Sequence, residues 1–219
     1  MLKEKGGNYI GNITFDKEII YQELLNFLNT NLIEFPAFLI QNGPTLSTED
    51  EITQLLDTFL TIKVREREIA LFIFKNQFGY PGTKRSSDIG VIVQQFSKKD
   101  AFFVIEAKRL PTPGHGREKE YVLGNLGGIE RFKRAHHGNG LPYGAILGYI
   151  QENDTDHWYG TINGWITKLI KTNTDTTIVW NKNDLLQTLK NTKISTYKST
   201  NKRIGQSDII LYHYWISFN

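Results

Sequence analysis

The feature that most constrains this chain is a pair of short apolar segments, 87–93 and 101–108. Both are rich in β-branched and aromatic residues, which is typical of β-strands. The linker between them, 94–100, is short and polar, so the two segments are predicted to form an antiparallel hairpin. Further strands and helices along the chain extend this hairpin into a mixed sheet with helices on its faces.

The second strand of this hairpin carries charge on one face. Side chains of a strand alternate between its two faces, so Glu106 and Lys108 share a face with Val104. Burying either charge alone would cost several kcal/mol, so each needs the other, a metal ion or water. Asp88 lies at the start of the first strand, and pairing of the hairpin brings its carboxylate beside Glu106.

Two converging carboxylates are typical of a Mg²⁺ site, because Mg²⁺ prefers oxygen ligands and keeps several waters. A metal ion held there generates a hydroxide nucleophile and neutralises the charge that develops on a phosphate. Lys108 lies one pleat beyond Glu106, where it could orient the attacking water or stabilise the transition state. The alternative is an ion pair at the strand end, between Lys108 and either Asp88 or Glu106, without catalysis.

The rest of the chain has the pattern of an α/β protein. The first 45 residues hold an amphipathic stretch at 17–28, and a clearer helix begins at Ser47 or Thr48, where acids follow the N-cap and apolar side chains recur at helical spacing. The basic segment 118–134 is expected to be a helix, although Gly127 and Gly128 weaken this expectation. Further strands are predicted at 69–74, 143–150, 176–180 and 209–218, and further helices at 156–171 and 184–189.

Length and composition favour a single domain of 219 residues. Within it, 1–45 is expected to be an N-terminal extension, 46–150 the core that carries the chemistry, and 151–219 a C-terminal elaboration of the same sheet. The absence of cysteine excludes disulfides and thiolate zinc sites. No apolar run resembles a signal peptide or could span a bilayer, so the expectation is a cytoplasmic protein without a membrane partner.

Positive charge is concentrated after the hairpin. Residues 108–134 contain seven basic and three acidic side chains, a net charge of +4, whereas the whole chain has +3. Such a concentration is typical of a surface that binds phosphates, and the alternative is a solvated helix face. The candidate contacts to nucleic acid are Lys84, Arg85, Arg109, Arg131 and Lys133. The adjacent His136 and His137 are expected to make loop contacts rather than bind a metal, because no third ligand is suitably spaced.

Asp88 on one strand, followed by Glu106-Ala107-Lys108 on the next, resembles the motif of the PD-(D/E)XK nuclease superfamily, which includes many restriction endonucleases. Asp88 and Glu106 match its two acids and Lys108 its lysine, whereas Ser87 stands where the family usually has proline. The resemblance implies a restriction-endonuclease-like core and hydrolysis of phosphodiester bonds. It also implies a Mg²⁺ cofactor, for which Mn²⁺ can substitute, bound by Asp88, Glu106 and the backbone carbonyl of Ala107.

Segments 106–132 and 197–213 resemble a set of bacterial members of this superfamily in restriction and phage defence. This narrower resemblance implies a DNA endonuclease, with DNA expected rather than RNA as the substrate. It would act in restriction or antiviral defence, as a homodimer or with a defence-system partner protein. The alternative is a non-catalytic nucleic-acid-binding subunit, or one regulated by a partner, that keeps the nuclease fold.

Many members of this superfamily carry another acid on the helix that precedes the sheet. Glu49 and Glu51 both flank the apolar stripe of the helix predicted here, and helical geometry does not separate them. Glu51 lies nearer the body of the helix, so it is expected to complete the catalytic set, with Glu49 as the alternative. Acids in a first helical turn are also explained by the helix dipole alone.

Overall fold

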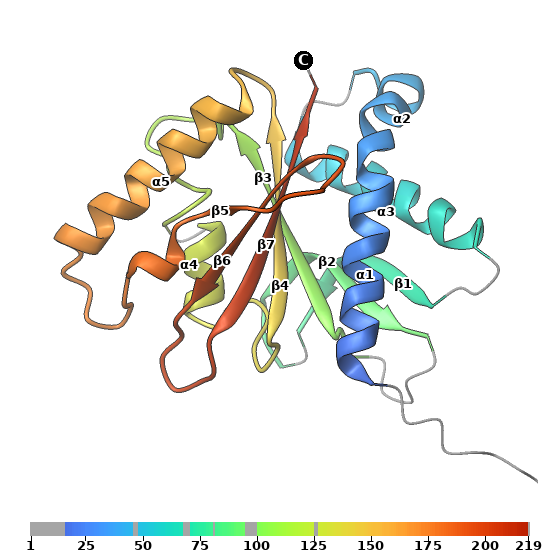
Figure 1. Cartoon of the computed structure of the whole chain (residues 1–219). Coiled ribbons are helices and arrows are strands. Elements are labelled where there is room, and N and C mark those ends of the chain that lie inside the picture. Colours follow the sequence, from blue (N-terminus) through green and yellow to red (C-terminus); the bar gives the residue numbers. More distant parts are fainter. Residues whose placement is uncertain are drawn as a thin grey trace, which may run out of the picture.

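A mixed, open sheet of seven strands forms the centre of the molecule, and helices cover both of its faces (Figure 1). The computed structural model describes residues 16–45, 48–67, 71–80, 82–94, 100–124 and 127–218. The strand order is β1-β2-β3-β4-β7-β6-β5, with β3, β4 and β7 parallel and every other neighbouring pair antiparallel. The strands are β1 (Phe72–Gly79), β2 (Ser86–Val93), β3 (Phe103–Leu110), β4 (Tyr143–Ile150), β5 (Gln187–Thr188), β6 (Ser195–Asn201) and β7 (Ile209–Ser217).

The helices begin where the sequence supplies capping side chains. Asp16 caps the first helix, and Thr48 forms a reciprocal capping box with Glu51 at the start of the third. The α-helices are α1 (Lys17–Asn31), α2 (Phe35–Asn42), α3 (Glu49–Arg65), α4 (Gly128–Lys133) and α5 (Thr155–Thr172), and the 3₁₀ turns are η1 (Leu32–Glu34) and η2 (Lys182–Asp184).

Each face of the sheet has its own hydrophobic core. On one face, α1, α2 and α3 pack against strand residues such as Ile105 and Leu147. On the other, α4 and α5 pack against strand residues such as Val104 and Ile146. Figure 1 shows the two helical layers on opposite sides of the sheet. Since neighbouring strand residues belong to different cores, strand phase decides which layer a side chain meets.

The predicted hairpin is confirmed. Strands β2 and β3 pair antiparallel, with Ile89 opposite Ile105 and Val91 opposite Phe103. From β3 the chain crosses over through α4 and returns as β4, parallel to β3. This order puts α4 above the charged end of β3, on the face that holds Val104.

The sequence also predicted most of the long elements correctly. The α/β class with a mixed sheet and flanking helices is confirmed, as are α3, α5, β4 and β7, and the amphipathic stretch 17–28 lies within α1. The strand expected at 69–74 instead spans Phe72–Gly79, and residues 68–70 lie outside the described part, as do 95–99 of the hairpin linker.

Three predictions are wrong. The basic helix is only Gly128–Lys133, preceded by turns, because Gly127 and Gly128 begin the helix rather than interrupt it. A Cβ on Gly127 would come within 2.4 Å of the carbonyl carbon of Leu123, so this turn requires glycine. Residues 176–180 form turns instead of a strand, and 184–189 contain β5 instead of a helix.

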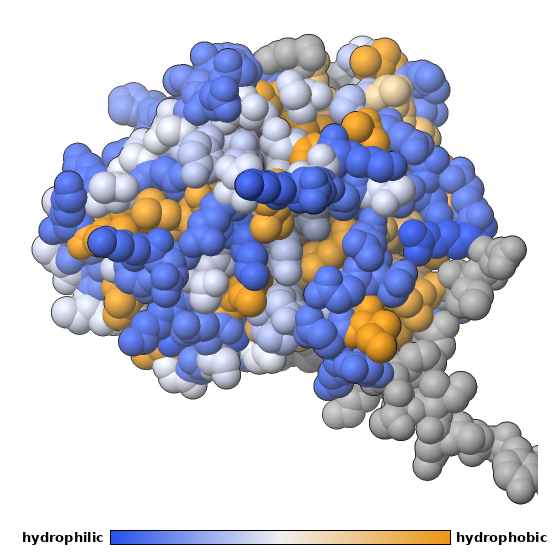
Figure 2. Space-filling view, viewed as in Figure 1, coloured by the Kyte–Doolittle hydropathy of each residue, from blue (hydrophilic) through white to orange (hydrophobic). Residues whose placement is uncertain are grey.

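The face seen in Figure 2 is mostly hydrophilic, with hydrophobic residues in small, separated areas. Exposed large hydrophobic side chains include Ile19, Ile33 and Ile40 of the helical layer formed by α1, η1 and α2. In the part of the chain that the structure describes, the helices are all too short or too polar to cross a membrane.

Candidate active site

The hairpin brings the two predicted carboxylates together. Ile89 lies opposite Ile105 in the antiparallel pairing, and Asp88 and Glu106 are the next residues along the two strands. The Ala107 N–H donates a hydrogen bond to Asp88 Oδ2 at 2.7 Å, which ties the carboxylate to the neighbouring strand. Glu106 is buried, with only 1% of its side chain exposed. The two acids therefore lie beside each other on adjacent strands, as the motif required.

The Lys108 ammonium lies in a cage of three oxygens. Its Nζ donates to Glu106 Oε1 at 3.0 Å, to Glu49 Oε1 at 3.0 Å and to the Ala107 carbonyl oxygen at 2.7 Å. Burial alone lowers the pKa of Lys108, but the negative charges of Glu106, Glu49 and Asp88 outweigh burial and raise the pKa above its usual value. Lys108 is therefore a fixed positive charge and cannot serve as a proton acceptor near neutral pH.

The helix acid that reaches this cage is Glu49, and the choice of Glu51 is corrected. Glu49 Oε1 contacts Lys108 Nζ, and Glu49 Oε2 accepts the Arg109 N–H at 3.0 Å. Glu51 is exposed and its Oε2 accepts from the Thr48 hydroxyl at 2.7 Å, as part of the capping box. The capping geometry directs Glu51 back toward the start of the helix, while Glu49, at the first helical position, faces β3. Burial raises the pKa of Glu49.

Two side chains that follow β3 in sequence complete the surroundings of Glu106. Arg131 of α4 donates from Nη1 to Glu106 Oε1 at 3.0 Å, which agrees with its predicted position facing the site. His137 Nε2 lies 3.3 Å from Glu106 Oε2, and the His137 side chain is fully buried. Burial and the charges of Arg131 and Lys108 lower the pKa of His137 to about 2, so the contact joins a neutral imidazole to a carboxylate.

The turn after α4 explains how His137 reaches the sheet. Ala135 adopts a positive φ of 55°, and the His136 N–H donates to the Arg131 carbonyl at 2.8 Å, so the chain reverses directly after the helix. The imidazole then contacts Ser87 Oγ through Nδ1 at 3.0 Å. The expectation of a loop contact is correct in kind for His137, but its partner is the motif carboxylate. No periodic pattern in the sequence signalled this contact.

The pKa of Asp88 is raised, and this makes the stability of the protein depend on pH. Burial, followed by the charge of Glu106, raises the pKa of Asp88 from its usual 3.8 to about 7. Below about pH 4 the group is protonated in folded and unfolded chains alike. The stability contributed by protonated Asp88 is thus complete at low pH, and it is lost as the pH rises through about 7.

We therefore expect the metal-free protein, kept in EDTA, to lose stability between about pH 4 and pH 7 through this group, with no further loss above that range. Asp88→Asn cannot ionise, so the variant should become increasingly stable relative to the wild type as the pH rises. Urea unfolding of both proteins across this pH range measures the difference. A difference that stays constant with pH would contradict the shifted pKa of Asp88.

The predicted nucleic-acid contacts do not all lie on the surface. Lys84 and Arg85 are exposed in the loop before β2, and Arg85 lines a cavity of about 410 Å³ next to Tyr80 and His136. Arg109 is half-buried, and its Nε donates to Gln151 Oε1 at 2.6 Å. Arg131 lies at the site. The prediction for Lys133 is wrong.

Lys133 is buried inside the protein, where no phosphate can reach it. Its Nζ lies 2.5 Å from Asp184 Oδ1, and neither side chain has any exposed area. The ammonium also lies 4.8 Å from the centre of the Trp180 ring. α4 therefore places Arg131 at the site and is anchored to the rest of the protein through Lys133. From the sequence alone, both side chains were predicted to contact nucleic acid.

The side chains around Lys108 fit Mg²⁺ in kind. Asp88, Glu106, Glu49 and the Ala107 carbonyl supply the hard oxygen ligands that Mg²⁺ prefers. They are not arranged in advance: within the described residues, no group of three His, Asp or Glu side chains is positioned to hold a metal ion. The ammonium of Lys108 takes up three of these oxygens, and Arg131 shares one of them. A metal ion that binds any of those three oxygens would therefore compete with the Lys108 ammonium for it.

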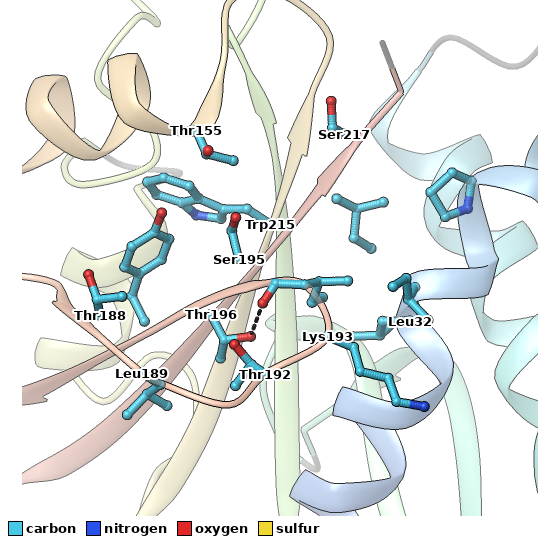
Figure 3. Close-up of a pocket in the computed structure, with 15 residues that line it drawn as sticks. Leu32, Thr155, Thr188, Leu189, Thr192, Lys193, Ser195, Thr196, Trp215 and Ser217 are labelled. Atoms are coloured by element: carbon cyan, nitrogen blue, oxygen red, sulfur yellow. Dashed lines mark hydrogen bonds between the residues drawn. The ribbon is translucent and has the colours of Figure 1, made fainter.

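A second, larger cavity lies away from these residues. It has a volume of about 560 Å³ and is lined by hydroxyl side chains from β5, β6 and α5, including Thr188, Ser195 and Thr155. Figure 3 shows these hydroxyl groups around the cavity, with the Trp215 ring between Thr155 and Ser195. None of the predicted site residues lines this cavity.

Comparison with protein-family models, curated proteins and solved structures finds no match for this chain. The resemblance to PD-(D/E)XK nucleases thus stays a prediction from the motif residues. The position of those residues on adjacent strands is an independent geometric observation.

Proposed function

We propose that this protein is a Mg²⁺-dependent nuclease with a restriction-endonuclease-like core that hydrolyses phosphodiester bonds. The observation that carries the proposal is the convergence of Asp88, Glu106 and Lys108 from adjacent strands, with Glu49 reaching the same point from α3. Local chain geometry did not require this meeting, because Glu49 is 59 residues from Lys108 in the sequence. An isolated strand-end ion pair would not need the additional acid.

Within this proposal, Asp88, Glu106 and the Ala107 carbonyl hold the metal ion, and Mn²⁺ can replace Mg²⁺ because it also binds oxygen ligands. The bound ion would lower the pKa of a water and neutralise charge on the phosphate. Lys108 carries a fixed positive charge, so its role is to orient the attacking water and stabilise the negative charge of the transition state. Glu49 Oε1 contacts Lys108 Nζ at 3.0 Å, the same distance as Glu106 Oε1, so both acids hold Lys108 in place.

Arg131 contributes to binding of the phosphate. Its side chain is 18% exposed while its guanidinium contacts Glu106, so solvent and a phosphate group can reach part of it. A guanidinium presents paired donors to phosphate oxygens. Lys84, Arg85 and Arg109 are the remaining candidates for contacts to the nucleic-acid backbone. DNA is the proposed substrate, in bacterial restriction or anti-phage defence, with a homodimer or a defence-system partner as the acting form.

The decisive experiment is cleavage of supercoiled plasmid DNA with Mg²⁺ and with EDTA. We expect the wild-type protein to nick or linearise the plasmid only with Mg²⁺, and Asp88→Asn to reduce the rate by about 100- to 1,000-fold. Asp156→Asn, an exposed acid on α5, is the matched control and should cut like the wild type.

Three other outcomes are informative. Binding of DNA without cleavage, unchanged in Asp88→Asn, would contradict the proposal and favour a non-catalytic binding subunit. Cleavage of RNA but not of DNA would correct the substrate. Cleavage that appears only after a partner protein is added would support the partner-regulated alternative, consistent with the closed oxygen cage around Lys108.

A further inference from the structure

We propose that Tyr80, Ser87 and His137 form a buried hydrogen-bond relay that holds the Glu106 carboxylate in a single orientation. His137 is then a positioning residue, since it acts on the reaction through Glu106. The inference rests on the proposed function only in giving Glu106 the role of a metal ligand. The relay itself follows from the contacts of four side chains that come from three separate segments of the chain.

The relay runs through the interior of the protein. The Tyr80 hydroxyl contacts Ser87 Oγ, and Ser87 Oγ lies 3.0 Å from His137 Nδ1. His137 Nε2 lies 3.3 Å from Glu106 Oε2. Ser87 and His137 are fully buried, so water does not compete for these contacts. The path therefore leads from the loop after β1, through β2, to a carboxylate on β3.

The partners of the Tyr80 hydroxyl indicate the direction of the hydrogen bonds. The Gly138 N–H can only donate, and it points at the Tyr80 hydroxyl oxygen at 3.5 Å. Among the described residues, Ser87 Oγ is the acceptor within reach of the single Tyr80 hydroxyl proton, so we assign this proton to the Tyr80–Ser87 contact. Ser87 in turn gives its proton to His137 Nδ1. A neutral imidazole that accepts at Nδ1 carries its proton on Nε2, where it faces Glu106 Oε2.

If the hydrogen bonds ran in the opposite direction, from His137 to Tyr80, two lone pairs would face each other at Glu106. If His137 carried its proton on Nδ1, it would donate to Ser87, and Ser87 would donate to Tyr80. The bare Nε2 lone pair would then face a carboxylate oxygen at 3.3 Å, and neither buried atom has a hydrogen-bond partner of good geometry among the described residues. Buried polar atoms without partners are costly. A proton on Nε2 makes this contact attractive instead of repulsive.

A neutral donor suits the second oxygen of a metal-binding carboxylate. Glu106 Oε1 already faces the positive charges of Lys108 and Arg131. A third cation on Oε2 would compete directly with a metal ion, whereas a neutral N–H orients the carboxylate and leaves its charge in place. Groups that orient ligands in this way typically change metal affinity by about 10- to 100-fold.

The protonation pattern of His137 can be tested without metal or substrate. We expect ¹H–¹⁵N spectra of histidine-labelled protein to show the His137 proton on Nε2 and none on Nδ1. Ser87→Ala removes the proton donor to Nδ1 and should allow a mixture of both forms. Ser86→Ala, the neighbouring serine on the other face of β2, is the matched control and should leave the His137 signals unchanged. A wild-type proton on Nδ1 would overturn the relay.

The positioning role is tested by calorimetric titration with Mg²⁺ and Mn²⁺. We expect His137→Leu to weaken metal binding by about 10- to 100-fold. His137→Gln, whose amide N–H can still donate to Glu106, should recover most of this loss, and Ser87→Ala should cause a smaller loss. His157→Gln on α5 is the control and should bind like the wild type.

The two proposals fail in different ways. If the wild type binds metal but cuts no nucleic acid, the nuclease function is contradicted and the relay still stands. If the wild type cuts nucleic acid, and folded Ser87→Ala and His137→Leu bind metal like the wild type, the relay is overturned and the function stands. Should His137→Leu fail to fold, Ser87→Ala and His137→Gln decide the outcome. If the wild type binds no metal, the function and the positioning role both fall.

Discussion

Lys108→Met is expected to bind Mg²⁺ more tightly than the wild-type protein and yet to lose cleavage by about 100- to 1,000-fold. The tighter binding follows from the oxygen cage, because the ammonium occupies Glu106 Oε1, Glu49 Oε1 and the Ala107 carbonyl at 2.7 to 3.0 Å. Methionine has a similar length without the charge, so these oxygens become free for the cation. Cleavage falls because the transition state loses a fixed positive charge.

The opposite direction of the two effects makes this prediction specific. Calorimetric titration with Mg²⁺ measures the affinity, and single-turnover cleavage of plasmid DNA measures the rate. Lys168→Met, an exposed lysine of α5, is the matched control and should change neither quantity. If Lys108→Met cut DNA at the wild-type rate, or bound Mg²⁺ more weakly, the description of Lys108 as a cation that competes with the metal would be wrong.

Asp184→Leu is expected to lower the free energy of unfolding by about 3–5 kcal/mol. The substitution leaves the Lys133 ammonium without a counter-charge in a position with no exposed area. Burial lowers the pKa of Lys133 and raises the pKa of Asp184, so the interior disfavours both charges when they are considered separately. Only their mutual contact offsets that cost.

The double variant Lys133→Met/Asp184→Leu should recover most of the lost stability, because apolar side chains of similar size remove both charges from the interior. A remaining loss is expected, since Asp184 Oδ2 also accepts the Asn181 N–H at 2.6 Å. Urea unfolding of the two single variants, the double variant and the wild type measures this cycle. If Asp184→Leu changed stability by less than about 1 kcal/mol, the ion pair would not hold α4 in place.

The double variant also tests whether Lys133 belongs to a nucleic-acid surface. A buried anchoring role predicts that the refolded double variant binds and cuts DNA like the wild type. Loss of DNA binding in this variant at full stability would restore the prediction made from charge density alone. Charge density in sequence does not distinguish the two roles, since Arg131 and Lys133 are only two residues apart on one short helix.

Local patterns were sufficient where a segment had one strong periodicity. The alternation in 101–108 predicted which face of β3 carries Glu106 and Lys108, and the capping residue with the apolar stripe predicted α3. The hairpin followed from two apolar strands with a short linker, and it brought Asp88 beside Glu106. These features depend on the alternation of side chains along a strand and on contacts between residues close in the sequence. Both can be predicted from the sequence alone.

Segments without such periodicity were predicted poorly. β6, which has serine, threonine and asparagine at many positions, lacks an apolar alternation, and it exists because it pairs with β7. The segment 176–180 has β-branched residues but forms a turn and a bend, and none of the strands in the described part of the chain pairs with it. Strand formation depends on such a partner more than on intrinsic preference.

By itself, the sequence determined the α/β class, the strand phase and the meeting of Asp88, Glu106 and Lys108, because all three depend on periodicity and on one short hairpin. Only the tertiary structure decided that Glu49 rather than Glu51 reaches Lys108, that Lys133 is buried, and that His137 faces Glu106. Those contacts join residues 31 to 59 positions apart in the sequence, and they depend on how α3 and the turn after α4 pack against the sheet. The spacing of residues along the chain does not predict that packing.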